Sequence, residues 1–565
     1  MSINPCIPGV SGRALPEVDP ITVEVIGSAL ATIAEEMGKA VIRAAFSTNI
    51  KERHDCSTAL FDRDGRTLAL AEHIPIHLGS LLGITEYVLA NTDLATLRPG
   101  DIFIGNDAYT GGGTHLNDFV LMEPVFYQEQ LVGWVANLAH HSDFVDRGHA
   151  HIFQEGLRIP PVRLYRQGVL QDDVLQLILL NCQVPRERVN DLRAQTAASR
   201  LGVERFHSLC DKYGAGVVAA AGQAILDYTE RRARAGIAAI PDGNYSFRHD
   251  FDTNLIAETL DLTVNIEVRN DEIFFTFPYA PSQVRAPINM VFTALLATVY
   301  YAVKVLVDPE IPANAGFHRP IHVSAPLGSI LNATAPAAVY SRTDLAPRLV
   351  DMIFAAFAPT LPDRVAAAST GGMLLTTSGM HPRTGRFYVY NEMHGGGMGA
   401  RADKDGLDGV QVNITNTANM PIEALESEHP VMVERYELVQ DSGGPGEYRG
   451  GMTLRRRVRV LDHTATLSAG GTNHRIPPFG LFGGLAGIPA RVELAPGIAP
   501  LVGRAGILAA GQSVGIVPAA GGGYGDPRRR CRDRVRRDLR EERISRQAAV
   551  DIYGLDPADP LLHDD

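Results

Sequence analysis

The sequence contains few cysteines, and their placement excludes two common uses of the thiol. There are five in 565 residues, scattered along the chain as Cys6, Cys56, Cys182, Cys210 and Cys531. An odd number without any Cys-x-x-Cys spacing predicts neither a disulfide framework nor a thiolate zinc site. A reducing cytoplasm is therefore the expected location.

Long apolar runs are also missing. No stretch reaches the ~18 uninterrupted apolar residues that a membrane span needs. The first twenty residues carry proline, glycine and acidic side chains where a signal peptide needs a basic start and an apolar core. We expect no membrane span, and we interpret residues 1–20 as an irregular leader.

Positive charge is in deficit, with 52 lysines and arginines against 64 acidic residues and a formal net charge of −12. Such a surface repels a polyanion, so nucleic acid is not an expected partner. The single arginine run, residues 528–547, is interspersed with acidic residues and predicts an exposed helix. Small molecules and other proteins are the partners that remain.

Nucleotide-binding loops are absent as well. The glycine clusters of the second half contain neither the Gly-Lys-Ser/Thr of a phosphate loop nor a G-x-G-x-x-G that opens a helix. We expect no ATP site on this chain alone.

What the sequence does contain predicts a mixed α/β (α+β), multi-domain protein. Apolar residues recur at helical spacing up to about Ala45, an Asp64-Gly65 turn joins two short strands, and residues 181–235 are helical and free of proline after Pro185. Strands and helices follow without regular β-α alternation. We predict an α/β domain at 21–235, a central α/β domain at 236–420, and a glycine-rich β-like region with a C-terminal helix at 421–565.

Histidine is concentrated in one segment, because eight of the eighteen lie between residues 54 and 151. Within it, residues 119–126 and 131–140 have the pattern of two strands joined by a polar turn around Glu129. An antiparallel hairpin about that turn pairs residues whose numbers sum to about 258, which sets Asp118 opposite His140. Opposed Cβ atoms are only ~5 Å apart, so one cation could bridge the two side chains.

His115 lies three residues before Asp118, after a Thr-Gly-Gly-Gly stretch that favours a loop. A loop that curls back over the hairpin end would give two imidazoles and one carboxylate, a set that suits Zn²⁺, Mn²⁺, Fe²⁺ or Ni²⁺. Asp143, Asp146 and His149 are possible supporting partners or alternative ligands. The competing interpretation is a rim of ordinary hydrogen-bonded side chains at a strand end.

Two other histidine patterns are weaker. His73 and His77 are one helical turn apart, but Pro75 lies between them, and we expect a packed or capping pair. The Gly148–His151 stretch, Gly-His-Ala-His, has no regular β-α alternation around it and predicts a surface loop.

Six long blocks in order resemble the B-type chain of the hydantoinase/oxoprolinase family. They include STNIKERHDCSTALFDRDGRTLALAEHIPIHLGS, PGDIFIGNDAYTGGGTHLNDFVLMEPVF, GGGMGARADKDGLDGVQVNITNTANMPIEALE and ERYELVQDSGGPGEYRGG. The resemblance runs from about Asp19 to Gly554 and implies a hydantoinase B-like fold. It also implies a hetero-oligomer in which ATP and Mg²⁺ are bound by a separate A-type subunit.

The activity that this resemblance implies is ATP-dependent opening of a cyclic amide such as a hydantoin, 5-oxoproline or a lactam. Relatives that carboxylate ketones leave that chemistry as an alternative, and a non-catalytic scaffold is a third. The family's metal block maps onto His115, Asp118 and His140, the same three residues that the hairpin predicts. Asp143, Glu52 and Asp55 are then the candidate general bases near a divalent metal such as Zn, Mn or Fe.

Overall fold

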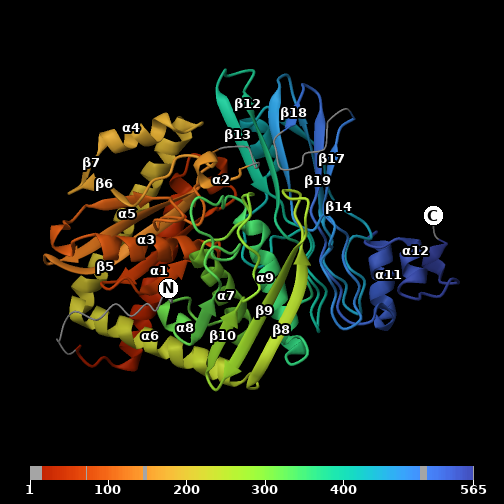
Figure 1. Ribbon diagram of the computed structural model, residues 1–565, viewed down its shortest axis with the longest axis horizontal. Helices are drawn as coiled ribbons and strands as arrows, with labels where there is room; N and C mark the ends of the chain where they lie inside the picture. The colour runs from red at the N-terminus through yellow and green to blue at the C-terminus, as the bar shows by residue number, and fades with distance from the viewer. Residues whose placement is uncertain (1–14, 72, 144–148, 497–505, 564–565) are drawn as a thin grey trace.

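The computed structural model describes residues 15–71, 73–143, 149–496 and 506–563. Figure 1 shows three groups of elements side by side: a first sheet with its helices, a second sheet with its helices, and two further sheets followed by the C-terminal helices. In the described part of the chain, no helix is long and apolar enough to cross a membrane.

The first group is built on a seven-stranded antiparallel sheet in the order β2-β1-β5-β4-β3-β6-β7. Its strands are β1 (Cys56–Asp62), β2 (Thr67–Ala71), β3 (Ile102–Gly105), β4 (Asp118–Tyr127), β5 (Gln130–His140), β6 (Val162–Arg166) and β7 (Val169–Leu170). Its helices are α1 (Pro20–Ala44), α2 (Thr48–Lys51), α3 (His77–Asn91), α4 (Asp172–Leu180), α5 (Pro185–Tyr213) and α6 (Ala215–Ala238).

Both faces of this sheet are buried, and successive side chains of each strand alternate between them. Leu60 and Val135 pack with α1 and α5 on one face, whereas Phe61 and Trp134 pack with α3 on the other. Asp19 caps α1 by accepting a hydrogen bond from the backbone N–H of Thr22, and Pro20 occupies the first turn. The helix expected to end near Ala45 ends at Ala44.

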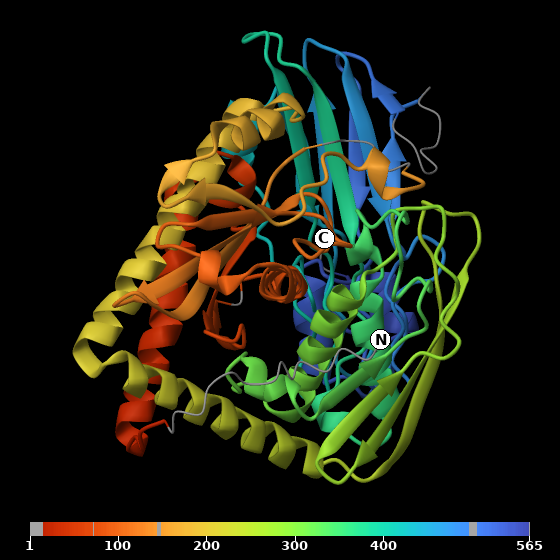
Figure 2. The same ribbon diagram turned by 60° about the vertical axis from the view of Figure 1, so that its left-hand side comes forward.

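The second group is a four-stranded sheet in the order β11-β10-β9-β8, in which only β10 and β11 run parallel. Its elements are β8 (Gly243–Phe251), β9 (Leu260–Arg269), β10 (Glu272–Thr276), α7 (Phe292–Val307), α8 (Ala315–His318), β11 (Ile321–Ser324) and α9 (Ala346–Phe357). Helix α9 packs on β8 and β9, while α7 contacts α3 and so joins this group to the first. In Figure 2, α6 runs from the end of α5 to the base of this sheet.

The third group pairs two four-stranded sheets, β13-β12-β16-β18 and β14-β15-β19-β17, around one apolar core. The strands are β12 (Met373–Met380), β13 (Phe387–Met393), β14 (Val431–Leu438), β15 (Leu454–Val460), β16 (Ala465–Gly471), β17 (Arg491–Leu494), β18 (Gly506–Leu508) and β19 (Ser513–Val517). The helices are α10 (Ile422–Glu428), α11 (Arg532–Arg540) and α12 (Arg546–Asp551).

The mixed α/β class predicted from the sequence is confirmed. The division into domains stays a prediction, although strands from both sides of residue 420 share one sheet, because β12 pairs with β16. The arginine run forms α11 as expected, but Arg530 just before it is buried and bonds to Asp405 and Asp538. The exposed-helix interpretation was wrong for that residue, since two carboxylates compensate its charge in the interior.

Candidate metal centre

The β4–β5 hairpin brings Asp118 and His140 together in the register expected from the sequence. The two residues are directly opposed at the open end of the hairpin. The turn at the other end uses Gln128 and Glu129, both with positive φ, which gives a two-residue turn that matches the twist of the strands. The pairing that sums to 258 therefore holds from Asp118 to Val125.

His115 reaches the same end from a tight loop. Gly111 has φ +76°, and a side chain there would lie 2.4 Å from the carbonyl oxygen of Gly83; Gly113 would meet Asn106 at the same distance. Only glycine lets the loop pack this closely, and the loop turns His115 back over the hairpin. Nε2 of His115 lies 2.9 Å from Oδ1 of Asp118.

His115, Asp118 and His140 each offer one ligand atom, and all three atoms lie within 4.8 Å of one another. Asp118 is fully buried and His115 is 4% exposed. Nδ1 of His115 lies 3.3 Å from the carbonyl oxygen of Tyr340, which can only accept a hydrogen bond. A neutral imidazole carries one N–H, so it can donate to only one of these two oxygens. A cation between Nε2 and Asp118 would leave the proton on Nδ1, where the carbonyl oxygen of Tyr340 accepts it.

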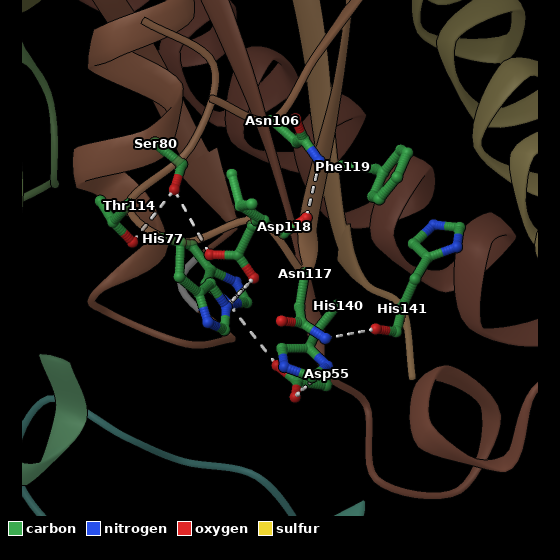
Figure 3. A network of polar contacts seen from close by, with 12 residues as sticks. Asp55, His77, Ser80, Asn106, Thr114, Asn117, Asp118, Phe119, His140 and His141 are labelled. Atoms are coloured by element: carbon green, nitrogen blue, oxygen red, sulfur yellow. Dashed lines mark hydrogen bonds and ion pairs between the residues drawn. The ribbon is translucent and has the colours of Figure 1, made fainter. Parts of the chain in front are cut away.

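The structure adds His77 and Asp55 to these three side chains (Figure 3). Nε2 of His77 lies 3.5 Å from Oδ1 of Asp55 and 3.9 Å from Oδ1 of Asp118. Its Nδ1 is 2.9 Å from the Ser57 hydroxyl. Nδ1 of His140 lies 3.9 Å from the other oxygen of Asp55. The packed or capping pair expected of His73 and His77 was wrong, because the two rings have separate partners. His73 meets Cys56 and Glu35, whereas His77, the first residue of α3, meets Ser57 and Asp55.

Arg342 supplies the fixed positive charge of the cluster. It lies in the short 3-10 helix η3 (Arg342–Asp344), is 3% exposed, and donates from Nη2 to Oδ2 of Asp118 at 2.9 Å and from Nε to the hydroxyl of Thr114 at 2.6 Å. Ser80 also donates to Oδ2 of Asp118, at 3.4 Å. One oxygen of Asp118 is thus held by donors while the other faces His115.

Burial and charge set the protonation of these groups. Burial lowers the pKa of His77 and of His140, and burial together with Arg342 lowers the pKa of His115 to about 4. Burial acts to raise the pKa of Asp118, but His115 and Arg342 outweigh it and hold that pKa well below its usual range. Since His115 is itself neutral at pH 7, Arg342 is the lasting cause. Neutral imidazoles beside an ionised carboxylate are the protonation states that metal ligands need.

A cavity of about 70 Å³ opens onto the cluster. Its walls come from the first group of elements and from segments far along the chain; the charged and imidazole side chains among them are Arg53, Asp55, His77, His115, His140, Arg342 and Asp344. The cavity can hold several waters or a small ring, so the cluster is accessible to a ligand.

The remaining predicted residues lie elsewhere. The Asp143 carboxylate binds Nη2 of Arg188 at 2.5 Å, and Glu52 ends α2; among the described residues, neither lines the cavity. His141 points to the opposite face and meets Oε1 of Gln195 at 2.9 Å. His149 is buried near Tyr340, so the surface-loop expectation fails there, because that ring packs inward. Asp146 lies outside the described residues.

Comparison with known proteins gives the family. The model of the hydantoinase B/oxoprolinase family matches residues 19–527. The chain belongs to this family. An uncharacterised protein of Methanocaldococcus jannaschii is 37% identical over 95% of this chain and 96% of its own length. The B-type chain of a putative D-/L-hydantoinase from a Pseudomonas species is 32% identical over 96% of each chain.

Two solved structures are similar to this hydantoinase B/oxoprolinase family member. The crystal structure of the ATP-dependent caprolactamase from Pseudomonas jessenii matches with a TM-score of 0.85 and 30% identity, over 97% of this chain and 99% of that one. The nucleotide-free structure of acetone carboxylase matches with a TM-score of 0.83 over 95% and 79% of the two chains. At 19% identity, that second likeness concerns the fold alone.

Proposed function

We propose that this chain is the B-type subunit of an ATP-dependent cyclic amide hydrolase, working with a separate A-type subunit that binds ATP and Mg²⁺. The observation that carries the proposal is the buried His115–Asp118–His140 cluster facing a cavity large enough for a small ring. The names of the relatives support it, since one is the B-type chain of a putative hydantoinase and one solved structure is a caprolactamase.

The three residues fit a divalent metal by their chemistry. Two nitrogens and one carboxylate oxygen form a donor set that suits Zn, Mn or Fe, and Nε2 of His115 already lies beside Oδ1 of Asp118. Arg342 and Tyr340 hold Asp118 and His115 in position from behind. When bound, such a metal supplies Lewis-acid chemistry that polarises a carbonyl or phosphoryl oxygen.

Asp55 is the predicted base that lines the cavity, where its oxygens lie near His77 and His140. In the proposed reaction, water adds to the carbonyl carbon of the ring and gives a proton to Asp55. The ring opens when the C–N bond breaks and the nitrogen takes up the proton held by Asp55; where the amide oxygen carries a phosphoryl group, a second water then releases it as inorganic phosphate. Activation of the amide with ATP belongs to the partner, because the sequence lacks a phosphate loop with its lysine and hydroxyl.

Asp118→Asn is the variant that tests the metal role, since it keeps the shape of the side chain but removes its charge. We expect metal content and ring-opening activity to fall together by ~10- to 100-fold, with the fold and the partner complex intact. Asp261→Asn, at an exposed ion pair with Arg248, is the matched control and should change neither. Full activity of Asp118→Asn with a lowered melting temperature would show that Asp118 is only structural.

Ketone carboxylation is the second candidate, because the acetone carboxylase structure shares the fold. The two-subunit enzyme should be incubated with ATP and labelled bicarbonate, using hydantoin, 5-oxoproline, caprolactam and acetone as substrates. Ring hydrolysis leaves no label in the product, whereas carboxylation retains it. Label in a ketone-derived acid would replace the hydrolase proposal, and normal turnover after chelation with substoichiometric metal would favour the scaffold interpretation.

A further inference from the structure

We propose that the cavity contains an oxyanion subsite formed by Arg342 and Arg53, and that the substrate of this enzyme is held there as an anion. The inference rests on the proposed function, because it names the chemical class of the ligand that the same cavity takes. Both guanidinium groups line the cavity, although the two residues are far apart in the sequence.

The guanidinium of Arg342 does not use all of its N–H donors within the ranges that the structure describes. Its Nη2 and Nε atoms bond to Asp118 and Thr114, but within the described part of the chain its Nη1 atom makes no hydrogen bond. A guanidinium carries five N–H donors in a rigid plane, a geometry that matches the oxygens of a carboxylate or a phosphate. The two N–H groups of Nη1 are therefore unused within the described residues, and Arg342 lines the same cavity as His115 and His140.

Arg53 is buried and forms no ion pair among the described residues. It is 2% exposed, and its hydrogen bonds go to neutral acceptors, namely Oδ1 of Asn49, the Thr417 hydroxyl and the carbonyl oxygens of Asn391 and Ala418. The Glu392 carboxylate acts on Arg53 electrostatically but is already paired with Arg456. A buried cation that shares its counter-ion is costly, so an anionic ligand in the cavity would stabilise Arg53.

Two oxyanions of the proposed reaction match this subsite. One is a phosphoryl group that the partner places on the amide oxygen, and the other is a carboxylate that the substrate itself carries. Both present oxygens that a guanidinium binds through two parallel hydrogen bonds. Inorganic phosphate represents the phosphoryl group and acetate represents the substrate carboxylate, so the binding of these two probes distinguishes the two sources.

The experiment measures the binding of each probe to the metal-loaded chain by calorimetry, with metal content measured on the same sample. We expect the wild-type chain to bind one probe, and Arg342→Gln to weaken that binding at least ~10-fold. Arg248→Gln, at an exposed ion pair, is the control and should bind as wild type does. Tighter binding of phosphate identifies the phosphoryl source, and tighter binding of acetate identifies the substrate carboxylate.

Arg53→Gln is the second variant, because Arg53 contacts none of the three metal ligands directly. Its Nη1 donates to Oδ1 of Asn49, whose amide meets Nδ1 of His140, so metal content is measured together with probe binding. This variant should keep its metal and lose affinity for the same probe by ~10-fold. Unchanged affinity in both variants, no binding of either probe to wild type, or loss of metal from both variants would each overturn the subsite. The two proposals can fail separately. If the two-subunit enzyme opens no ring but the chain still binds phosphate through Arg342, only the hydrolase proposal is rejected. If the enzyme opens the ring but the chain binds neither probe, only the subsite is rejected.

Discussion

Two polar clusters of this protein each enclose a fully buried carboxylate and differ in what surrounds it. The first is the metal cluster, defined as His115, Asp118 and His140. The second is the closed cluster, defined as Glu392 and Arg456 with Tyr390, in which Nη1 of Arg456 bonds both oxygens of Glu392 at 2.9 and 3.1 Å and the Tyr390 hydroxyl donates to the same carboxylate. Both contain a carboxylate that is 0% exposed.

The difference lies in the donors around the carboxylate and in open space. The backbone N–H of Met420 also donates to Glu392, and the backbone oxygen of Met420 accepts from Arg456, so each oxygen of Glu392 accepts two hydrogen bonds. In the metal cluster, His115 meets Oδ1 of Asp118 and lines a cavity. Burial and a lowered carboxylate pKa occur in both clusters, so neither property identifies a site by itself.

Breaking the closed cluster should give the largest change in stability. Arg456→Met leaves the Glu392 carboxylate buried without its cation, and we expect a loss of ~3–5 kcal/mol in the free energy of unfolding. The measurement is urea unfolding, with metal content determined on the folded protein. Arg455→Met on the same strand, where the ion pair with Glu437 is partly exposed, should cost at most ~1 kcal/mol.

The contrast between the two clusters is contradicted if Arg456→Met lowers the free energy of unfolding no more than Arg455→Met does, or if folded Arg456→Met has lost its metal. The first result would mean that the closed cluster does not stabilise the fold. The second would mean that the two clusters are coupled.

A smaller effect is expected at the edge of the metal cluster. His77→Gln removes an imidazole that lies between Asp55 and Asp118, and we expect metal affinity to fall by ~10-fold while the fold is kept. His141→Gln is the matched control, since His141 is equally buried but bonds Gln195 on the other face. Competition with a metal-indicator dye measures both, and equal losses in the two variants would contradict the assigned role of His77.

An effect that depends on pH concerns the segment that carries Tyr340 and Arg342. Oε1 of Glu155 accepts from the backbone N–H groups of Val339 and Tyr340, both at 2.7 Å, and burial raises the pKa of Glu155 from 4.5 to about 8. The folded chain therefore keeps a proton there that the unfolded chain releases above about pH 4.5. Stability from this group is fully present below pH 4.5 and is lost as the pH rises through 8.

Glu155→Gln stays neutral, so it should match wild type near pH 5 and become more stable than wild type by ~1–3 kcal/mol at pH 9. Unfolding by urea at pH 5, 7 and 9 measures this difference. Glu129→Gln, in the exposed β4–β5 turn, should show no such trend. A Glu155→Gln advantage that is constant with pH would show that Glu155 is ionised in the folded chain at pH 5.

The sequence could predict the part of the site that depends on local geometry. A hairpin fixes its register through its turn, so Asp118 and His140 could be paired by counting, and the glycines before His115 indicated a loop. Arg342 and Tyr340 could not be found in this way, because they lie more than 200 residues from the hairpin and reach it through packing of the second group. His77 had a signal in its spacing from His73, but Pro75 between them suggested a different role.

The central claim is that the metal cluster binds a metal and the closed cluster does not. Its most direct test is elemental analysis of the purified chain and of two histidine variants. One is His140→Ala in the metal cluster, and the other is His394→Ala, a buried histidine that interacts electrostatically with Glu392 of the closed cluster. We predict about one divalent metal per chain in wild type and in His394→Ala, and a substoichiometric amount in His140→Ala. Equal metal content in all three proteins, or a wild-type chain that lacks metal and still supports ring opening with its partner, would contradict the claim.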